Sequence, residues 1–138
     1  MAGNIRLEIV TPEMSVVAED AQIVMAPGAL GEFGVLIGHT PFMTTLSLGT
    51  VRYTDAKGSE KLVFVSGGFA EALPDKVTIL AESAERRSDI DLERAKSALE
   101  RARQRLGREE RDLDFERVRA ALERALHRIK LAESKRSQ

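Results

Sequence analysis

Apolar and polar residues alternate over short runs through the first two thirds of the chain, which is the pattern of half-buried β-strands. Ile5, Leu7 and Ile9 open the pattern. Further runs cover residues 21–26, 34–37, 50–54, 61–66, 69–73 and 77–81. Turn-forming residues at 55–58 and 74–76 separate neighbouring runs. Many short strands with Gly and Pro between them predict an antiparallel β-sandwich or a flattened barrel.

The last third of the chain follows a helical period instead. Apolar residues recur at steps of three and four, which places them on one face of a helix. They are Leu92, Ala95, Leu99, Ala102 and Leu106 in a first stripe, then Phe115, Val118, Leu122, Ala125 and Ile129 in a second. Ser88 with Asp91 predicts the start of the first helix, Gly107 its end, and Asp112 or Asp114 the cap of the second. Two helices joined by a few residues predict an antiparallel hairpin.

The charge balance divides the chain at the same place. Residues 1–84 hold five basic and ten acidic side chains, whereas residues 85–138 hold 16 and 12. We therefore expect two domains, a β-sandwich over residues 1–84 and a helical hairpin over residues 85–138. The chain has no cysteine, which excludes disulfides, thiolate metal sites and cysteine nucleophiles.

Residues that could support catalysis are few. The only histidines are His39 and His127, and neither has the spacing of a metal ligand pair. The glycine-rich stretch 28–34 lacks the Gly-Lys-Ser/Thr ending of a phosphate loop and does not open a helix. The sequence therefore predicts no catalytic residue and no metal site.

Arginines form the most distinctive pattern of the helical part. They recur at steps of seven, four and three in the first predicted helix and seven and four in the second: Arg94, Arg101, Arg105 and Arg108, then Arg117, Arg124 and Arg128. In an antiparallel hairpin, late residues of the second helix approach the start of the first, so several guanidinium groups would converge there. Such a cluster suits a polyphosphate, and a solvated mixed-charge face is the alternative. Nucleic acid fits less well, because no aromatic side chain lies among these arginines.

A stretch without charged residues runs from residue 33 to 51. Its threonines, glycines and proline argue against a membrane-spanning helix. We expect it to contribute a surface that contacts something apolar.

Several sequence stretches together resemble the epsilon-subunit family of bacterial F-type rotary ATP synthases, over essentially the whole chain. They are residues 7–12 (LEIVTP), 31–36 (GEFGVL), 38–41 (GHTP), 66–69 (SGGF) and 77–81 (VTILA). The resemblance implies a β-sandwich followed by a helical hairpin, as the periodicity does.

The resemblance implies a non-catalytic subunit of the central rotor stalk of a proton-translocating enzyme. The sandwich would bind the gamma subunit and the membrane-embedded c-ring, with Glu32 and His39 in the loop region at that rotor interface. The hairpin would extend toward the alpha/beta catalytic head and inhibit ATP hydrolysis. The implied location is the cytoplasmic face of the bacterial inner membrane, peripheral and held there through the complex.

Some members of that family bind ATP in the hairpin through a motif Ile/Leu-Asp-x-x-Arg-Ala, and residues 90–95 match its fixed positions. The resemblance implies a regulatory ATP site, with Mg²⁺ as a possible companion. Its residues would be Glu85, Ile90, Asp91, Arg94, Ala95, Arg101, Arg124 and Arg128. Asp91 and Glu85 would contact the base or order the site, and Arg94, Arg124 and Arg128 would hold the phosphates.

Two other functions remain open on the sequence. The chain could be a stand-alone ATP sensor that uses the same hairpin, or a helical adaptor that docks through its Leu/Ala stripe.

Overall fold

A computed structural model describes residues 3–108 and 112–134, with side chains of residues 112–114 left out. The chain divides into two compact units, a β-unit up to Arg87 and a helical unit from Ser88. The sequence placed this division after residue 84. The structure places it later because residues 84–86 add one more strand to the β-unit.

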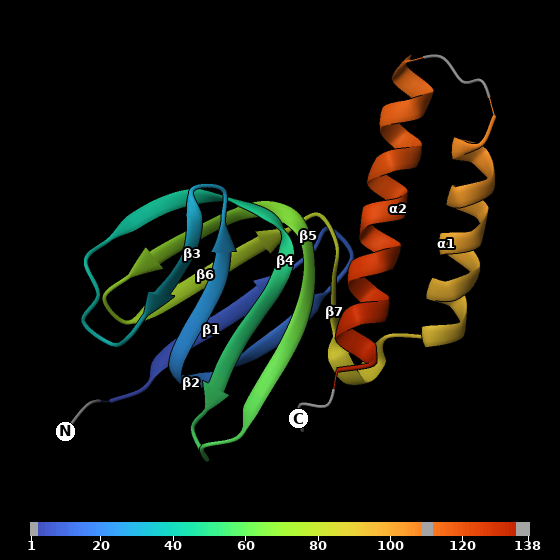
Figure 1. Cartoon of the computed structure of the whole chain (residues 1–138). Coiled ribbons are helices and arrows are strands. Elements are labelled where there is room, and N and C mark those ends of the chain that lie inside the picture. Colours follow the sequence, from blue (N-terminus) through green and yellow to red (C-terminus); the bar gives the residue numbers. More distant parts are fainter. Residues whose placement is uncertain (1–2, 109–111, 135–138) are drawn as a thin grey trace. The chain divides into compact units, whose positions relative to one another are not determined.

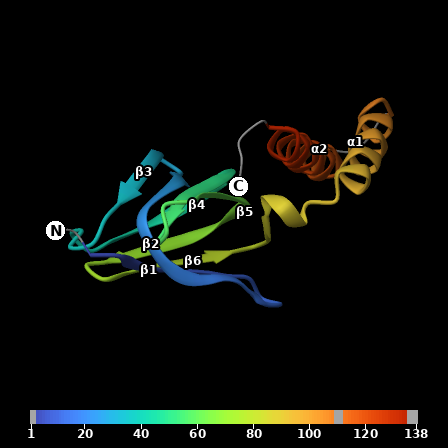
Figure 2. The ribbon, with the colours of Figure 1, turned by 90° about the horizontal axis from the view of Figure 1, so that it is seen from below.

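The β-unit is a flattened ring of strands (Figures 1 and 2). Its strands are β1 (Ile5–Val10), β2 (Ser15–Gly28), β3 (Gly31–Val35), β4 (Phe42–Asp55), β5 (Glu60–Leu73), β6 (Lys76–Ala81) and β7 (Ala84–Arg86). They pair in the order β1-β6-β5-β4-β2-β3, β1 also pairs with β2, and β7 pairs with β5. This confirms the expected β-sandwich, with one difference: β1 and β6 run parallel.

The core lies between the two layers of the ring. Ile5, Leu7 and Ile9 have no exposed surface, and β1 places Leu7 beside Val77 and Ile9 beside Ile79 of β6. The polar neighbours of these residues point outward because side chains alternate along a strand. The alternation in the sequence therefore identified the core face correctly.

Strand β5 is longer than its sequence suggests. The runs 61–66 and 69–73 form one strand that continues through Gly67 and Gly68. Both glycines have positive φ, and a Cβ on Gly68 would lie 2.0 Å from the carbonyl oxygen of Leu80. Only glycine allows β5 and β6 to approach this closely.

The helical unit consists of α1 (Leu92–Leu106) and α2 (Asp112–Ala132), which run antiparallel (Figure 1). The start predicted at Ser88 is wrong, because a 3-10 turn at Arg87–Asp89 comes first and Asp91 is the N-cap. Gly107 ends α1 as predicted, and its N–H donates to the carbonyl of Arg103. The proposed caps Asp112 and Asp114 have side chains outside the described residues.

Candidate functional site

The motif at residues 90–95 forms the start of α1. Asp91 has an extended backbone, and its Oδ1 accepts a hydrogen bond from the backbone N–H of Arg94 at 3.0 Å. The Asp91 carbonyl accepts from the N–H of Ala95 at 3.0 Å. Capping of this kind stabilises a helix by about 1 kcal/mol. Asp91 therefore stabilises the start of α1 as its N-cap. Ile90, directly before it in the motif, is half-buried.

Small side chains form the seam between α1 and α2. Ala95 and Ala102 are buried on α1, and Val118 and Ala125 are buried on α2. Such short side chains allow the helix axes to approach closely, and they bury little apolar area. Ala95, the last fixed residue of the motif, is therefore a packing residue.

Three of the predicted site arginines each come directly before a buried alanine of this seam. They are Arg94, Arg101 and Arg124. One residue corresponds to about 100° of helix rotation, so these side chains leave the helix on the flank beside the seam. Arg128 lies one turn after Arg124 and therefore on the same flank of α2.

The two arginine-bearing flanks lie on the same side of the helical unit. Antiparallel helices turn in opposite senses when viewed from one end, so positions that precede seam residues fall on one side of both. Lys96 follows Ala95, and Glu133 follows Ala132; their side chains pair at 3.7 Å on the opposite side. The structure therefore brings Arg94, Arg101, Arg124 and Arg128 to one face, which we call the arginine face.

The arginines of the arginine face differ in exposure and in the partners recorded for them. Arg94 and Arg101 are exposed, and Arg124 and Arg128 are half-buried. Among residues 3–108 and 112–134, no carboxylate pairs with the guanidinium of Arg94, Arg101 or Arg124. Guanidinium groups that share one face of a helix pair are chemically suited to a polyanion.

Glu85, the remaining residue predicted for this site, lies half-buried in β7 and so belongs to the β-unit. The predicted site residues are therefore divided between the two units, with the motif and all the arginines in the helical one.

The predicted rotor-interface residues lie on and after strand β3. The Glu32 carboxylate accepts a hydrogen bond from Nη2 of Arg52 at 2.9 Å, and Arg52 lies two strands away on β4. Nδ1 of His39 donates to the Thr40 carbonyl at 2.5 Å, and its ring lies 5.0 Å from that of Phe42. Both side chains are thus held by neighbours within the β-unit.

A patch of apolar side chains covers part of the outer surface of the β-unit. Phe69 and Leu80 face each other across β5 and β6, and each is 54% exposed. They line a groove of about 390 Å³ together with Val10, Pro12 and Ala81. We call this the Phe69 groove. The strand pattern alone does not predict this groove, although apolar residues at the outward positions of two alternating strands are its signal in the sequence.

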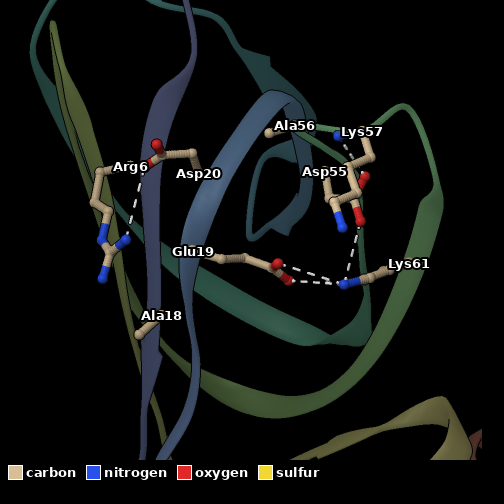
Figure 3. Close-up of a pocket in the computed structure, with 8 residues that line it drawn as sticks. All are labelled: Arg6, Ala18, Glu19, Asp20, Asp55, Ala56, Lys57 and Lys61. Carbon is tan, nitrogen blue, oxygen red and sulfur yellow. Dashed lines mark hydrogen bonds and ion pairs between the residues drawn. The ribbon is translucent and has the colours of Figure 1, made fainter.

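A second depression, of about 370 Å³, is polar (Figure 3). Lys61 donates to both carboxylate oxygens of Glu19 at 3.4 and 3.2 Å and pairs with Asp55 at 3.2 Å. Oη of Tyr53 donates to Glu19 at 2.5 Å, and the backbone N–H groups of Lys57 and Ser59 donate to Asp55. Charges of both signs neutralise one another here, so the depression has no clear preference for a charged ligand.

The contacts in and next to this depression shift the pKa values of the residues that make them. Burial alone would raise the pKa of Glu19, but hydrogen bonds from Tyr53 and Lys61 outweigh it and lower that pKa. The Ser59 N–H is the main cause of a lowered pKa at Asp55. Burial and the bond to Glu19 raise the pKa of Tyr53, so its phenol remains protonated and acts as a donor at neutral pH.

The described residues contain no group of three or more carboxylates and histidines that could hold a metal ion. No helix in this part of the chain is long and apolar enough to cross a membrane. The fold and the sites together define a protein with a β-sandwich, an exposed apolar groove and a basic helical hairpin.

Comparison with known proteins shows where such a chain belongs. Residues 4–87 match the family model for the ATP synthase delta/epsilon chain beta-sandwich domain, and residues 88–133 match that for the long alpha-helix domain. The chain belongs to the ATP synthase delta/epsilon chain family. This confirms the resemblance found in the sequence and agrees with the expectation of a non-catalytic subunit.

Two relatives match over nearly their full length. The ATP synthase epsilon chain of Desulfatibacillum aliphaticivorans is 63% identical over 136 residues, which is 99% of this chain and 96% of that one. The epsilon chain of Syntrophobacter fumaroxidans is 51% identical over 96% of this chain and 98% of its own length.

Solved structures show the same fold. A chain in the Euglena gracilis mitochondrial ATP synthase OSCP/F1/c-ring structure superposes with a TM-score of 0.76 at 26% identity, covering 89% of this chain and 78% of that one. A chain in the Tetrahymena thermophila central stalk/c-ring structure gives 0.65 at 9% identity over 95% and 98%. The second likeness concerns the fold alone.

Proposed function

We propose that this chain is a non-catalytic subunit of the central rotor stalk in a proton-translocating bacterial F-type ATP synthase. The observation that carries this proposal is the match of both family domains, in order, over residues 4–133. The 26% identical Euglena chain comes from an assembly that contains F1 and a c-ring, which supports the same partners here. The chain would be peripheral, at the cytoplasmic face of the inner membrane.

In this proposal the Phe69 groove is the surface that binds the gamma subunit. Exposed apolar patches rimmed by polar residues mark protein interfaces. Phe69 and Leu80 stand side by side on two paired strands, so they form a rigid apolar contact that needs little ordering on binding.

Binding to the gamma subunit tests this assignment. A Phe69→Asp variant places a charge in the groove and should abolish co-purification with gamma at micromolar concentration. Asn4→Asp adds the same charge at an exposed position before β1 and should bind normally. Thermal unfolding of both variants verifies that the fold persists. If the wild-type chain itself fails to bind its own gamma subunit, the rotor-stalk proposal is wrong.

The segment that follows the start of β3 would face the c-ring. It includes Glu32, His39 and the beginning of the stretch without charged residues. The chain contains no cysteine, so Glu32→Cys provides a single cross-linking position. We expect that position to cross-link to a c subunit in the assembled enzyme, and Lys57→Cys, in the exposed turn between β4 and β5, not to do so. Equal cross-linking at both positions would refute this orientation.

The helical unit would inhibit ATP hydrolysis by contact with the alpha/beta catalytic head, and ATP bound at the arginine face would relieve the inhibition. Supporting this, the arginine face gathers four guanidinium groups beside the seam, three of which lack a described carboxylate partner. A ligand that binds only the closed hairpin stabilises it by mass action and lowers the population of open forms.

Calorimetric titration of ATP, with and without Mg²⁺, tests the regulatory site. The Arg124→Ala/Arg128→Ala variant should lose saturable binding. Arg103→Ala removes an exposed arginine from the opposite flank of α1 and should bind like the wild type. Equal affinities of all three proteins for ATP would contradict a regulatory site at these arginines. The arginines would then be assigned to contacts with the catalytic head.

The two other functions predict different results. A stand-alone ATP sensor would bind ATP but not gamma, and a helical adaptor would keep its partner after loss of residues 1–84.

For the inhibitory role, removal of residues 88–138 should raise ATP hydrolysis by the reconstituted enzyme, and an unchanged rate would contradict that role.

A further inference from the structure

Strand β7 is the last element of the β-unit and the point from which the chain leaves toward the helices. It is three residues long and pairs with β5 at Ala84, Glu85 and Arg86. A strand this short has few backbone hydrogen bonds and is expected to fray unless side chains hold it.

The side chain of Arg86 supplies that attachment. In the strand register Arg86 lies opposite Val63, whose side chain is in the core, so Arg86 shares the inner face of the sheet. Its Nε donates to the Val16 carbonyl of β2 at 3.1 Å, and its Nη1 donates to Oη of Tyr53 on β4 at 3.4 Å. The Arg86 side chain thus joins β7 to both β2 and β4 by hydrogen bonds.

These hydrogen bonds connect to the contacts in the polar depression of Figure 3. Oη of Tyr53 accepts the hydrogen bond from Arg86 and donates its own to Glu19, which also pairs with Lys61. Lys61 in turn pairs with Asp55 at the end of β4. Every link is a charged or charge-assisted contact, and such contacts are stronger and more directional than neutral ones.

We propose that Arg86, Tyr53 and Glu19 form a clasp that holds β7 on the β-unit and thereby sets the length of the tether to the helical unit. With the clasp closed, the chain is anchored up to Arg86. With the clasp open, the anchor moves back to Ser83, whose hydroxyl lies 2.6 Å from that of Ser66. Three released residues lengthen the tether by about 10 Å.

This length matters for regulation, since it limits how far the helical unit can reach while the β-unit stays bound. That consequence rests on the proposed function, whereas the clasp itself does not. Hydrogen exchange and distance measurements on the isolated full chain can therefore test the clasp whether or not the proposed function holds.

Hydrogen exchange is the first test. Arg86→Ala should speed exchange of the amides that join β5 and β7, those of Phe64 and Glu85, by about tenfold, which corresponds to about 1.4 kcal/mol of local opening. Tyr53→Phe should act at the same amides with a smaller effect. Arg103→Ala should match the wild type. Unchanged exchange at Phe64 and Glu85 in Arg86→Ala, or an equal increase in β1 and β6, would overturn the proposal.

Distance measurement between spin labels is the second test. The chain has no cysteine, so Asp75→Cys and Ser97→Cys supply the only two labels, at exposed positions of the two units. In the Arg86→Ala background the longest distances should increase by up to about 10 Å relative to the same pair without it. Identical distance distributions would contradict control of the tether by the clasp.

Discussion

Gly68 provides the sharpest test of the packing between β5 and β6. Its φ is +119°, and a Cβ placed there would lie 2.0 Å from the carbonyl oxygen of Leu80 and 2.9 Å from Cα of Ala81. Both are backbone atoms of the paired strand, so no flexible side chain can yield. The expected perturbation from Gly68→Ala is therefore separation of the two strands.

The magnitude follows from two contributions. A residue other than glycine held at positive φ costs about 1–3 kcal/mol. A carbon and a carbonyl oxygen normally approach to about 3.3 Å, so Leu80 must move by more than about 1 Å and the pair between Gly68 and Ala81 must weaken. The displacement adds to the conformational cost, so the total loss should exceed about 3 kcal/mol, which is large for one substitution.

Gly58→Ala is the matched control. Gly58 also has positive φ, at +92°, but nothing lies within 4 Å of its added Cβ. It should pay only the conformational cost of about 1–3 kcal/mol. Urea unfolding can be followed by the fluorescence of Tyr53, the only tyrosine in a chain without tryptophan, so the signal reports the β-unit. Equal losses in the two variants would refute the argument from close strand approach.

Three further outcomes follow from the same contacts. Asp91→Ala should lower the stability of the helical unit by about 1 kcal/mol because the N-cap is lost, as measured by the helical circular dichroism signal during unfolding. Asp91→Asn should retain most of that stability. The pKa values of Glu19 and Asp55 are lower in the folded chain than in the unfolded one. The stability that these carboxylates contribute is therefore present above the unfolded pKa of about 4 and is lost as the pH falls through the folded pKa values. The melting temperature should drop steeply below about pH 4, and less steeply in Tyr53→Phe. Lys96→Ala should change stability by less than about 0.5 kcal/mol in thermal unfolding, because both partners of the ion pair with Glu133 are exposed.

Some features of the structure could be predicted because they depend on residues near one another in sequence. Alternation at Ile5, Leu7 and Ile9 identified a core strand, and the steps between Ala95 and Ala102 identified a helix face. The flank shared by the arginines also follows from helix periodicity and an antiparallel turn. The N-cap of α1, Asp91, cannot be told from Ser88 by residue type because both side chains can cap a helix; the 3-10 turn at Arg87–Asp89 decides between them.

Other features depend on strand partners that are distant in sequence. Nothing local to Gly67 and Gly68 shows that β5 continues through them, since that outcome depends on β4 and β6 on either side. The Phe69 groove likewise requires that Phe69 and Leu80 meet across paired strands.

The two-part plan, the core faces, the arginine pattern and the family can be predicted from the chain's residues, because periodicity and composition act over a few positions. The parallel pairing of β1 with β6, the apolar groove and the hydrogen bonds of Arg86 to Val16 and Tyr53 depend on the folded arrangement. Arg86 and Val16 are separated by 70 positions, and their contact is selected by the closure of the whole ring of strands. A short pattern contains no information about that closure, so long-range register must come from the folded chain.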